Sequence, residues 1–230
     1  MAGPGDAAAV LAGVTRMFGH VPALVRIDLR VERGEFVVLR GPNGAGKSTL
    51  LQLLGTAISP TLGGGSVLGF DLVRGRSAIR ARTELLGHHT RLYEELTAAE
   101  NLRFVCRLRG RGPGAIPAAL ERVGMTRTAD ERVRGFSPGM RQRLALARLL
   151  VVDPELLLLD EPFAACDQEA KALVEDIIRE LRLAGRTVVL ATHDHERLLR
   201  PDRVLWLAAG RLVRPDRAPA VAGAPAAGGA

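Results

Sequence analysis

Three apolar runs in the chain lack the alternation of polar and apolar residues that marks a half-exposed strand. They are EFVVLR at 35–40, ELLLLDEP at 155–162 and RTVVLATHD at 186–194. Such continuous apolar runs predict strands buried on both faces of a parallel sheet. Helical patterns begin near Lys47 and cover about 167–183 and 194–200. Because strands and helices alternate, the pattern predicts an α/β core with a mostly parallel sheet.

Two regions beside this core follow other patterns. Short β patterns bounded by turns at 9–16, 24–32 and 65–69 predict a small antiparallel sheet packed on the core. Residues 91–152 contain several helical patterns and no convincing strand. They therefore predict a helical subdomain inserted between two strands of the core.

Helix starts can be located inside this helical region. Thr97 and Glu100 have the spacing of a capping box. In VRGFSPGMRQRLALARLL, residues 133–150, Ser137 suits the N-cap and Pro138 suits the first helical position. One face of that helix is predicted to be apolar and consists of Met140, Leu144, Ala147 and Val151.

The charge of the chain bears on the role of this helix. The chain has 32 Lys and Arg residues against 25 Asp and Glu, a net charge of +7. The arginines and Gln142 of the helix are expected to face outward. Such a helix could bind nucleic acid through these side chains, or its N-terminus could bind a smaller ligand. Only Lys47 and Lys171 are lysines, and the arginines are scattered along the whole chain. The scatter favours ordinary surface charge over a nucleic-acid site.

Low-complexity composition marks both ends of the chain. Residues 1–8 and the Ala/Pro/Gly-rich residues 217–230 are predicted to be disordered. This leaves 9–216 as one domain, with its helical subdomain at about 91–152. No apolar run reaches the about 18–20 residues that a membrane span needs, and the N-terminus does not resemble a signal peptide. The chain is therefore expected to remain in the cytoplasm.

A glycine-rich sequence follows the first buried strand. GPNGAGKST at 41–49 matches the phosphate-binding pattern G-x-x-x-x-G-K-[ST] between a predicted strand and a predicted helix. Backbone amides would converge on phosphate oxygens, Lys47 would reach the β- and γ-phosphates, and Ser48 would coordinate Mg²⁺. A glycine-rich turn without a ligand is the alternative, which the full motif in this context disfavours. The candidate ligands are Gly41, Pro42, Asn43, Gly44, Ala45, Gly46, Lys47, Ser48 and Thr49.

Acidic residues end the second buried strand, and a histidine ends the third. Asp160 is placed to hold Mg²⁺ together with Ser48, and Glu161 to polarise the water that attacks the γ-phosphate. His193 could contact the γ-phosphate and orient that water, although a lone histidine at a strand end is usually structural. His193 and His195 have no third ligand nearby in sequence, so they do not predict a further metal site.

The order of these motifs resembles the ATP-binding subunit of ABC transporters, over about residues 8–212. FSPGM at 136–140 then corresponds to the signature motif of that family, usually LSGGQ, and keeps Ser137 and Gly139. The resemblance implies the P-loop ATPase fold of that family, with ATP and Mg²⁺ as ligands and two subunits packed head to tail. Ser137 and Gly139 of one subunit would touch the γ-phosphate held by the other.

Further positions are carried over from the resemblance one at a time. Phe18 matches the aromatic residue that stacks on adenine, with a position in the core as the alternative. In AACD at 164–167, Asp167 is retained and Ala164 replaces the usual serine. His89 stands where the family has a glutamine that senses Mg²⁺ and the attacking water, which argues against direct Mg²⁺ ligation from this position.

Two longer stretches resemble a narrower group within the family. LGHHTRLYEELTAAENLRF and FSPGMRQRLALARLL are similar to the heme-exporter ATP-binding subunits of cytochrome c maturation, the CcmA proteins. This implies an integral-membrane permease as partner, contacted through the surface near residues 87–100, and a peripheral position on the inner face of the cell membrane. An exporter of drugs, lipids or polysaccharides is the first alternative. A nucleic-acid-associated ATPase of the same family is the second.

Overall fold

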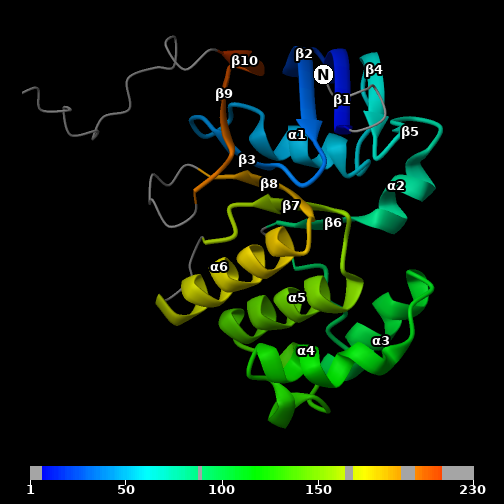
Figure 1. The fold of residues 1–230 in the computed structure, drawn as a ribbon, viewed down its shortest axis with the longest axis vertical. Helices are drawn as coiled ribbons and strands as arrows, with labels where there is room; N and C mark the ends of the chain where they lie inside the picture. Colours follow the sequence, from blue (N-terminus) through cyan, green and yellow to red (C-terminus); the bar gives the residue numbers. More distant parts are fainter. Residues whose placement is uncertain (1–6, 88–89, 164–167, 193–199, 214–230) are drawn as a thin grey trace, which may run out of the picture.

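Two β-sheets lie on either side of one helix, and further helices cover the far face of the larger sheet (Figure 1). The structure is a computed structural model that describes residues 7–87, 90–163, 168–192 and 200–213. The larger, six-stranded sheet has the order β10-β9-β3-β8-β7-β6, and the four-stranded sheet has the order β2-β1-β4-β5. The predicted α/β class, with a mostly parallel sheet, a small antiparallel sheet and a helical subdomain, is confirmed.

The elements have the following bounds. The larger sheet contains β3 (Phe36–Arg40), β6 (Thr83–Leu86), β7 (Leu156–Asp160), β8 (Thr187–Ala191), β9 (Arg203–Ala208) and β10 (Arg211–Val213). The smaller sheet contains β1 (Ala7–Phe18), β2 (Val21–Glu32), β4 (Leu62–Val67) and β5 (Phe70–Asp71). The helices are α1 (Lys47–Leu54), α2 (Arg76–Arg82), α3 (Ala98–Leu108), α4 (Ile116–Arg122), α5 (Pro138–Val152) and α6 (Gln168–Leu183). None of these helices is long and apolar enough to cross a bilayer.

The central strands of the larger sheet are covered on both faces. β3 pairs in parallel with β8 and β9, and β7 pairs in parallel with β8 and β6. In β7, Leu157 and Leu159 pack with the helices of the helical subdomain and α6, whereas Leu156 and Leu158 pack with α1 and the smaller sheet. β3 and β8 divide their side chains in the same way. This double burial explains why these strands show no polar alternation in the sequence.

The smaller sheet is antiparallel, as predicted, and its strands are longer than the sequence suggests. β1 begins at Ala7, because Ala7 and Ala8 are buried and Ala7 pairs with Glu32 of β2. The predicted disordered N-terminal segment, residues 1–8, therefore extends too far by these two residues. β1 also pairs with β4, where glycine permits close approach: a Cβ on Gly65 would lie 2.1 Å from the Val10 carbonyl oxygen.

The helical subdomain is inserted between β6 and β7, as predicted. α3 starts at the predicted capping box, since the Glu100 amide donates to Thr97 Oγ1 at 3.2 Å and the Thr97 amide donates to Glu100 Oε2 at 2.8 Å. α5 starts at the predicted N-cap, Ser137, whose Oγ accepts from the Met140 amide at 3.2 Å. The helix predicted at 194–200 falls largely on residues outside the described ranges.

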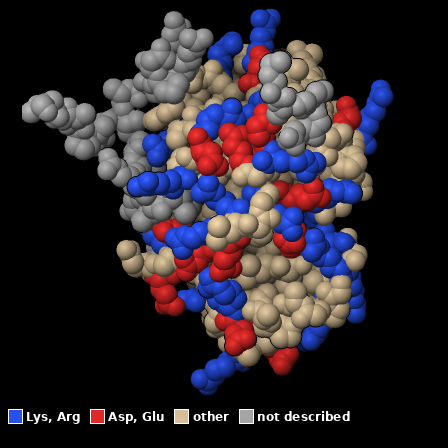
Figure 2. Space-filling view, viewed as in Figure 1, with Lys and Arg blue, Asp and Glu red and all other residues tan. Residues whose placement is uncertain are grey.

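One polar position of α5 does not face solvent as predicted. Arg148 is only 5% exposed, and its guanidinium lies 2.9 Å from the Glu84 carboxylate of β6. The other positions also have partners inside the chain: Arg141 pairs with Glu94, Arg143 with Glu169, and Gln142 donates to the Pro162 carbonyl oxygen. The prediction is wrong for Arg148, because the middle of α5 packs against β6, whereas Arg141 and Arg143 stay partly exposed and pair with exposed carboxylates. On the face shown in Figure 2, basic side chains likewise lie among acidic ones.

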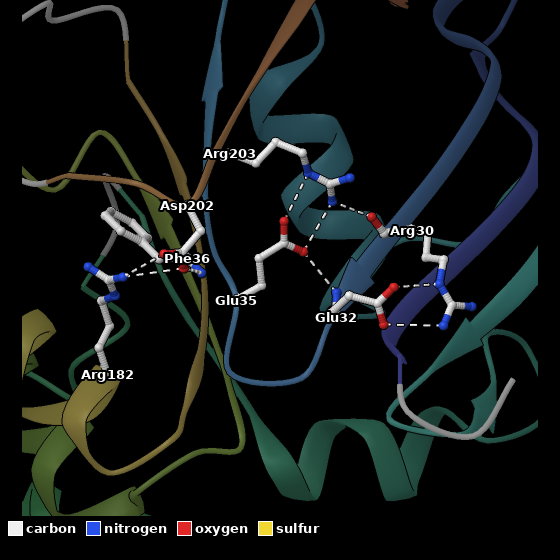
Figure 3. Close-up of polar contacts among 7 residues, drawn as sticks. All are labelled: Arg30, Glu32, Glu35, Phe36, Arg182, Asp202 and Arg203. Atoms are coloured by element: carbon white, nitrogen blue, oxygen red, sulfur yellow. Dashed lines mark hydrogen bonds and ion pairs between the residues drawn. The ribbon is translucent and has the colours of Figure 1, made fainter. Parts of the chain in front are cut away.

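Polar contacts hold the start of β3 in place, at the end of the strand away from the glycine-rich loop (Figure 3). The Phe36 amide donates to Asp202 Oδ2 at 2.7 Å, and Arg182 of α6 donates to both oxygens of the same carboxylate. Arg203 of β9 pairs with Glu35 at 2.9 Å. Both sets of contacts join β3 to its neighbours, so the strand that leads into the glycine-rich loop is held firmly at its base.

Candidate nucleotide site

The glycine-rich loop, residues 41–46, joins β3 to α1 and packs closely against neighbouring strands. Gly41 has a φ of +151°, and a Cβ there would lie 2.1 Å from the Leu207 carbonyl oxygen of β9. Gly46 is the N-cap of α1 and has a φ of +104°, and a Cβ there would lie 2.5 Å from the Ala23 carbonyl oxygen of β2. Only glycine fits at these positions. The amides of the first turn of α1 have no acceptor within the helix, whose first bond runs from the Leu50 amide to the Gly46 carbonyl oxygen, so they are placed to bind an anion.

Lys47 opens α1 and turns its ammonium group back over the loop. Its Nζ donates to the carbonyl oxygens of Gly41 at 2.8 Å and Pro42 at 3.2 Å. The same atom lies 3.9 Å from Glu161 Oε1, and Lys47 is only 7% exposed. A buried ammonium with neutral acceptors nearby and a carboxylate beyond hydrogen-bond distance is suited to a phosphate, which supplies negative charge at close range.

Asp160 ends β7 and is the buried acid of the site. It is 8% exposed, and its Oδ1 has no hydrogen-bond partner among the described residues. A buried carboxylate oxygen without a partner is costly, so this atom fits a Mg²⁺ ligand. Ser48, in the first turn of α1, is exposed and offers a second hard oxygen. Among the described residues there is no cluster of three or more His, Cys, Asp or Glu that could hold a metal.

Glu161 follows Asp160 in a strained backbone conformation. Its φ is +51°, in the left-handed region, and its amide donates to the Ala191 carbonyl oxygen of β8 at 2.9 Å. The turn brings the carboxylate to 3.9 Å from Lys47 Nζ. Strain of this kind in a residue other than glycine persists where the surrounding structure imposes it, and it is frequent at functional sites.

The carboxyl ends of β3, β6, β7 and β8 lie at the same edge of the larger sheet. β6 leads into Gly87, where a Cβ would lie 3.7 Å from the Cβ of Asp160. β8 leads into Thr192, whose amide donates to the Leu39 carbonyl oxygen of β3 at 3.2 Å. The chain segments before both predicted histidines therefore reach the edge that holds the acidic pair.

His89, His193 and Asp167 themselves lie outside the described residues, as does Ala164. Their predicted roles at the nucleotide site stay predictions.

Phe18 ends β1 and is not a core residue. Its side chain is 48% exposed, and the Arg16 guanidinium lies 4.6 Å from the centroid of the ring. The alternative of a core position is therefore wrong. Stacking of this exposed ring on adenine stays a prediction.

The start of α5 is not part of this cluster. Ser137, Pro138 and Gly139 are exposed. No hydrogen bond or ion pair within the described residues joins Ser137 or Gly139 to loop 41–49. One copy of the chain thus brings together the loop, its lysine and the acidic pair, whereas Ser137 and Gly139 are exposed and make no described polar contact with loop 41–49.

A buried ion triad that the sequence did not predict lies on β6, the strand that leads to Gly87 beside Asp160. Glu84 of β6 lies 2.9 Å from Arg148 of α5 and 2.6 Å from Arg109, the C-cap of α3. Arg148 Nη1 also donates to the carbonyl oxygen of Thr90, the residue after His89, at 2.7 Å. Burial lowers the pKa of Arg148, and Glu84 opposes this shift. The available signal was Arg148 itself, a charge within the apolar run LALARLL.

A glycine-rich loop between a parallel strand and a helix, a lysine folded over the loop and an acidic pair on a nearby strand define a P-loop nucleotide-binding fold. The profile of the ABC transporter family matches residues 24–164, and the chain belongs to that family. It is an ATP-binding subunit of the ABC transporter type and an ATPase.

Named relatives agree with this assignment. Daunorubicin resistance ATP-binding protein DrrA3 of Streptomyces coeruleorubidus is 40% identical over 213 residues, which cover 90% of this chain and 67% of that protein. ABC transporter ATP-binding protein NatA of Bacillus subtilis is 35% identical over 199 residues, covering 84% and 81%. The bacterial ABC transporter cassette MJ0796, solved as a dimer and in a post-hydrolysis state with ADP and Pi, has a TM-score of 0.81 at 28% identity, covering 90% and 97%. None of these three is named as a heme exporter.

Proposed function

We propose that two copies of the chain pack head to tail, hydrolyse ATP at shared sites and drive an export permease. The proposal rests on one observation: the phosphate-site residues and the signature residues Ser137 and Gly139 have no described polar contact within one chain. Lys47, Asp160 and Glu161 gather at one edge of the larger sheet. Ser137 and Gly139 are exposed at the N-terminus of α5, and in a dimer that helix end would complete the phosphate site of the other copy.

The surroundings of each residue support its proposed role. Lys47 and the loop amides would bind the β- and γ-phosphates, and Phe18 would stack on adenine. Ser48 and Asp160 would hold Mg²⁺, which supplies charge neutralisation on the phosphate oxygens. Glu161 would orient the attacking water and draw its proton. On the resemblance alone, His89 and His193 are proposed to contact the same water, and Asp167 to join the site.

ATP binding would close the dimer, and hydrolysis with product release would reopen it. The permease would contact the surface near residues 87–100 and hold the chain at the cytoplasmic face of the membrane. The position of Gly87 supports this route, because a Cβ there would lie only 3.7 Å from the Cβ of Asp160, so the start of that surface lies near the acidic pair. The dimeric solved relative supports the assembly of two copies.

Glu161→Gln tests the catalytic half of the proposal. Glutamine keeps the shape of the side chain and removes its charge, so ATP should still bind while phosphate release falls at least about 100-fold. The closed dimer should then accumulate, as measured by light scattering after gel filtration with ATP. Lys47→Ala is the comparison, because loss of the ammonium should weaken ATP binding and prevent the ATP-dependent dimer. Unchanged turnover in Glu161→Gln would remove Glu161 from catalysis.

Two export cargoes are supported by different observations. The stretches at 86–104 and 136–150 resemble the heme-exporter subunits of cytochrome c maturation and support a heme-related cargo. The name of DrrA3 supports an exporter of a drug-like molecule. Deletion of the chain should abolish c-type cytochromes in the first case. In the second case those cytochromes persist, and the protein co-purifies with an unrelated permease.

A nucleic-acid-associated role has the least support. Salt-sensitive binding of DNA or RNA by the purified chain would favour it over export.

A further inference from the structure

The last residues of β1 place an arginine against the exposed ring of Phe18. The guanidinium carbon of Arg16 lies 4.6 Å from the centroid of the ring, which is within the range of a cation–π contact. Phe18 nevertheless remains 48% exposed. Arg16 therefore covers one face of the ring and leaves the ring accessible to a ligand.

Hydrogen bonding alone does not account for the position of Arg16. This partly buried side chain makes one hydrogen bond, from Nη1 to the Ser59 carbonyl oxygen at 3.0 Å. Its Nε is buried and has no partner among the described residues, and no carboxylate of the described ranges pairs with the guanidinium. A buried donor without an acceptor is costly, so the contact with the ring is the interaction that this position serves.

The acceptor of that one hydrogen bond belongs to a segment that is itself held in place. Ser59 lies in the segment after α1, and its Oγ accepts from Arg76 of α2 at 3.2 Å. Arg76 and Arg80 also donate to the Thr56 carbonyl oxygen at 3.0 and 2.8 Å. Through Ser59, Arg16 thus connects the Phe18 ring to a support between the end of α1 and the start of α2.

The backbone of β1 has separate contacts to the same segment. The Met17 amide donates to Thr61 Oγ1 at 3.0 Å, and the Thr61 amide donates to the Thr15 carbonyl oxygen at 2.8 Å. Neither bond involves the Arg16 side chain. Loss of the guanidinium should therefore release the ring of Phe18 while the end of the strand stays in place.

We propose that Arg16 is a positioning residue for the nucleotide: it holds the Phe18 ring in the orientation that stacks on adenine. This inference rests on the stacking role proposed above for Phe18. A ring that is already held loses less conformational freedom when a base stacks on it, so the base binds more tightly. Guanidinium, ring and base would form three layers, with the base on the ring face away from Arg16.

Long-range attraction between the Arg16 charge and the triphosphate is the competing explanation. The two explanations differ in how Arg16 depends on Phe18. Orientation of the ring has an effect only while the ring is present, whereas the attraction of a cation for phosphate persists without it. A double-mutant cycle of these two residues therefore distinguishes them.

The cycle uses four full-length chains: wild type, Arg16→Gln, Phe18→Leu and the double variant. Each is titrated with the non-hydrolysable ATP analogue adenylyl imidodiphosphate in a calorimeter. Arg16→Gln should weaken binding about three- to tenfold in the wild-type chain and less than about twofold in the Phe18→Leu chain. Wild-type affinity in Arg16→Gln, or the same loss in both backgrounds, would overturn the proposal.

Two matched variants separate the ring contact from charge and from folding. Arg26→Gln removes the same charge from an exposed position on β2, the neighbouring strand, and should change the affinity less than about twofold. Arg16→Lys keeps a cation that can contact the ring and should bind the analogue more tightly than Arg16→Gln. A loss in Arg26→Gln equal to that in Arg16→Gln, or a lysine variant as weak as the glutamine variant, would overturn the proposal.

Steady-state hydrolysis of ATP gives a readout that general damage to the fold would not reproduce. Arg16→Gln should raise KM by about the factor lost in affinity and change kcat less than about twofold, because the loop, Lys47 and the acidic pair are untouched. A lower kcat at unchanged KM would contradict the positioning role.

The same measurements separate this inference from the proposed function. If Phe18→Leu weakens binding and Arg16→Gln does not, the role of Arg16 fails and stacking on Phe18 stands. If Phe18→Leu binds as tightly as wild type, the stacking part of the proposed function fails, and the role of Arg16 fails with it.

Discussion

Replacing Arg148 by methionine tests whether the buried triad holds the helical subdomain to the larger sheet. Arg148 is 5% exposed, and methionine is long enough to fill most of the same space without a large cavity. The change removes the ion pair at 2.9 Å to Glu84 and the hydrogen bond at 2.7 Å to the Thr90 carbonyl oxygen. Glu84 keeps its other partner, because Arg109 lies 2.6 Å away.

The expected loss of stability follows from the charges that stay buried. Removing one partner of a buried pair costs about 3–5 kcal/mol when the other charge is left alone. Because Arg109 still compensates Glu84, we expect Arg148→Met to lower the free energy of unfolding by about 2–3 kcal/mol. Glu84→Gln leaves both guanidinium groups without a carboxylate and should cost about 3–5 kcal/mol. Glu84→Leu combined with Arg148→Met removes both members of one pair and should cost less than the sum of its single changes.

Urea unfolding, followed by circular dichroism and by the fluorescence of the single tryptophan, Trp206, measures these costs. With a slope of about 2–3 kcal/mol per M, the midpoint of Arg148→Met should fall by about 1 M. Arg179→Ala is the control, because Arg179 pairs with Asp176 at the surface and should cost less than about 0.5 kcal/mol. A midpoint for Arg148→Met as close to wild type as that of the control would refute the reasoning. Strictly additive costs in the double variant would refute it too.

Three further predictions concern the loop, a helix start and the exposed aromatic ring. Gly41→Ala puts a Cβ 2.1 Å from the Leu207 carbonyl oxygen and should weaken binding of a fluorescent ATP analogue at least about tenfold. Gly44→Ala, whose Cβ meets no atom within 4 Å, should bind the analogue more tightly than Gly41→Ala, and equal affinities would contradict the packing argument. The Thr97 amide holds the pKa of Glu100 below its ordinary 4.5. The ionised carboxylate therefore stabilises the folded state at a pH above the unfolded-state pKa. This stability is lost as the pH falls through the folded-state pKa. A carboxyl NMR titration should place the Glu100 midpoint below 4.5, and a midpoint at that value would show that the capping box does not hold the carboxylate. Phe18→Leu should weaken binding of the ATP analogue by about 1 kcal/mol or more, because stacking on the base is lost. Thermal stability should change little, because Phe18 is 48% exposed. Undiminished affinity would exclude the stacking role.

The parts of the fold that the sequence predicts are those whose signal is local. β3, β7 and β8 are continuous apolar runs because both faces of the larger sheet are covered, and the capping box of α3 is complete within four residues of sequence. The phosphate loop is likewise a local signal, since its glycines occur at fixed positions where neighbouring backbone atoms leave no room for a Cβ. These elements were predicted at nearly their observed bounds.

The parts that it does not predict depend on partners distant in sequence. β6 is four residues long and begins with Thr83 and Glu84, which look like surface positions until the arginines of α3 and α5 are placed against them. Arg148 was assigned to an outward face for the same reason. The hairpin of β9 and β10 was not predicted, although Gly210 was a local signal for its turn, where Ala209 and Gly210 have φ of +46° and +73°.

The free energy of folding alone does not account for a buried arginine in α5. Apolar residues of similar volume are often as stabilising as a buried ion pair. What Arg148 adds is therefore a set of directional contacts that fix the position of α5 relative to β6. α5 carries Ser137 at its N-cap and Arg148 in its last turns, and Arg148 holds both the Thr90 carbonyl and Glu84 of the strand that leads to Gly87. A shift of the N-terminal end of α5, which carries Ser137, would therefore move groups next to Asp160. Apolar side chains in place of the triad would let α5 shift without moving those groups. The double variant Glu84→Leu with Arg148→Met separates the two explanations. If it stays folded but loses ATP turnover, the triad positions the sheet edge that holds Asp160 and Glu161, and if turnover is normal, the triad serves packing only.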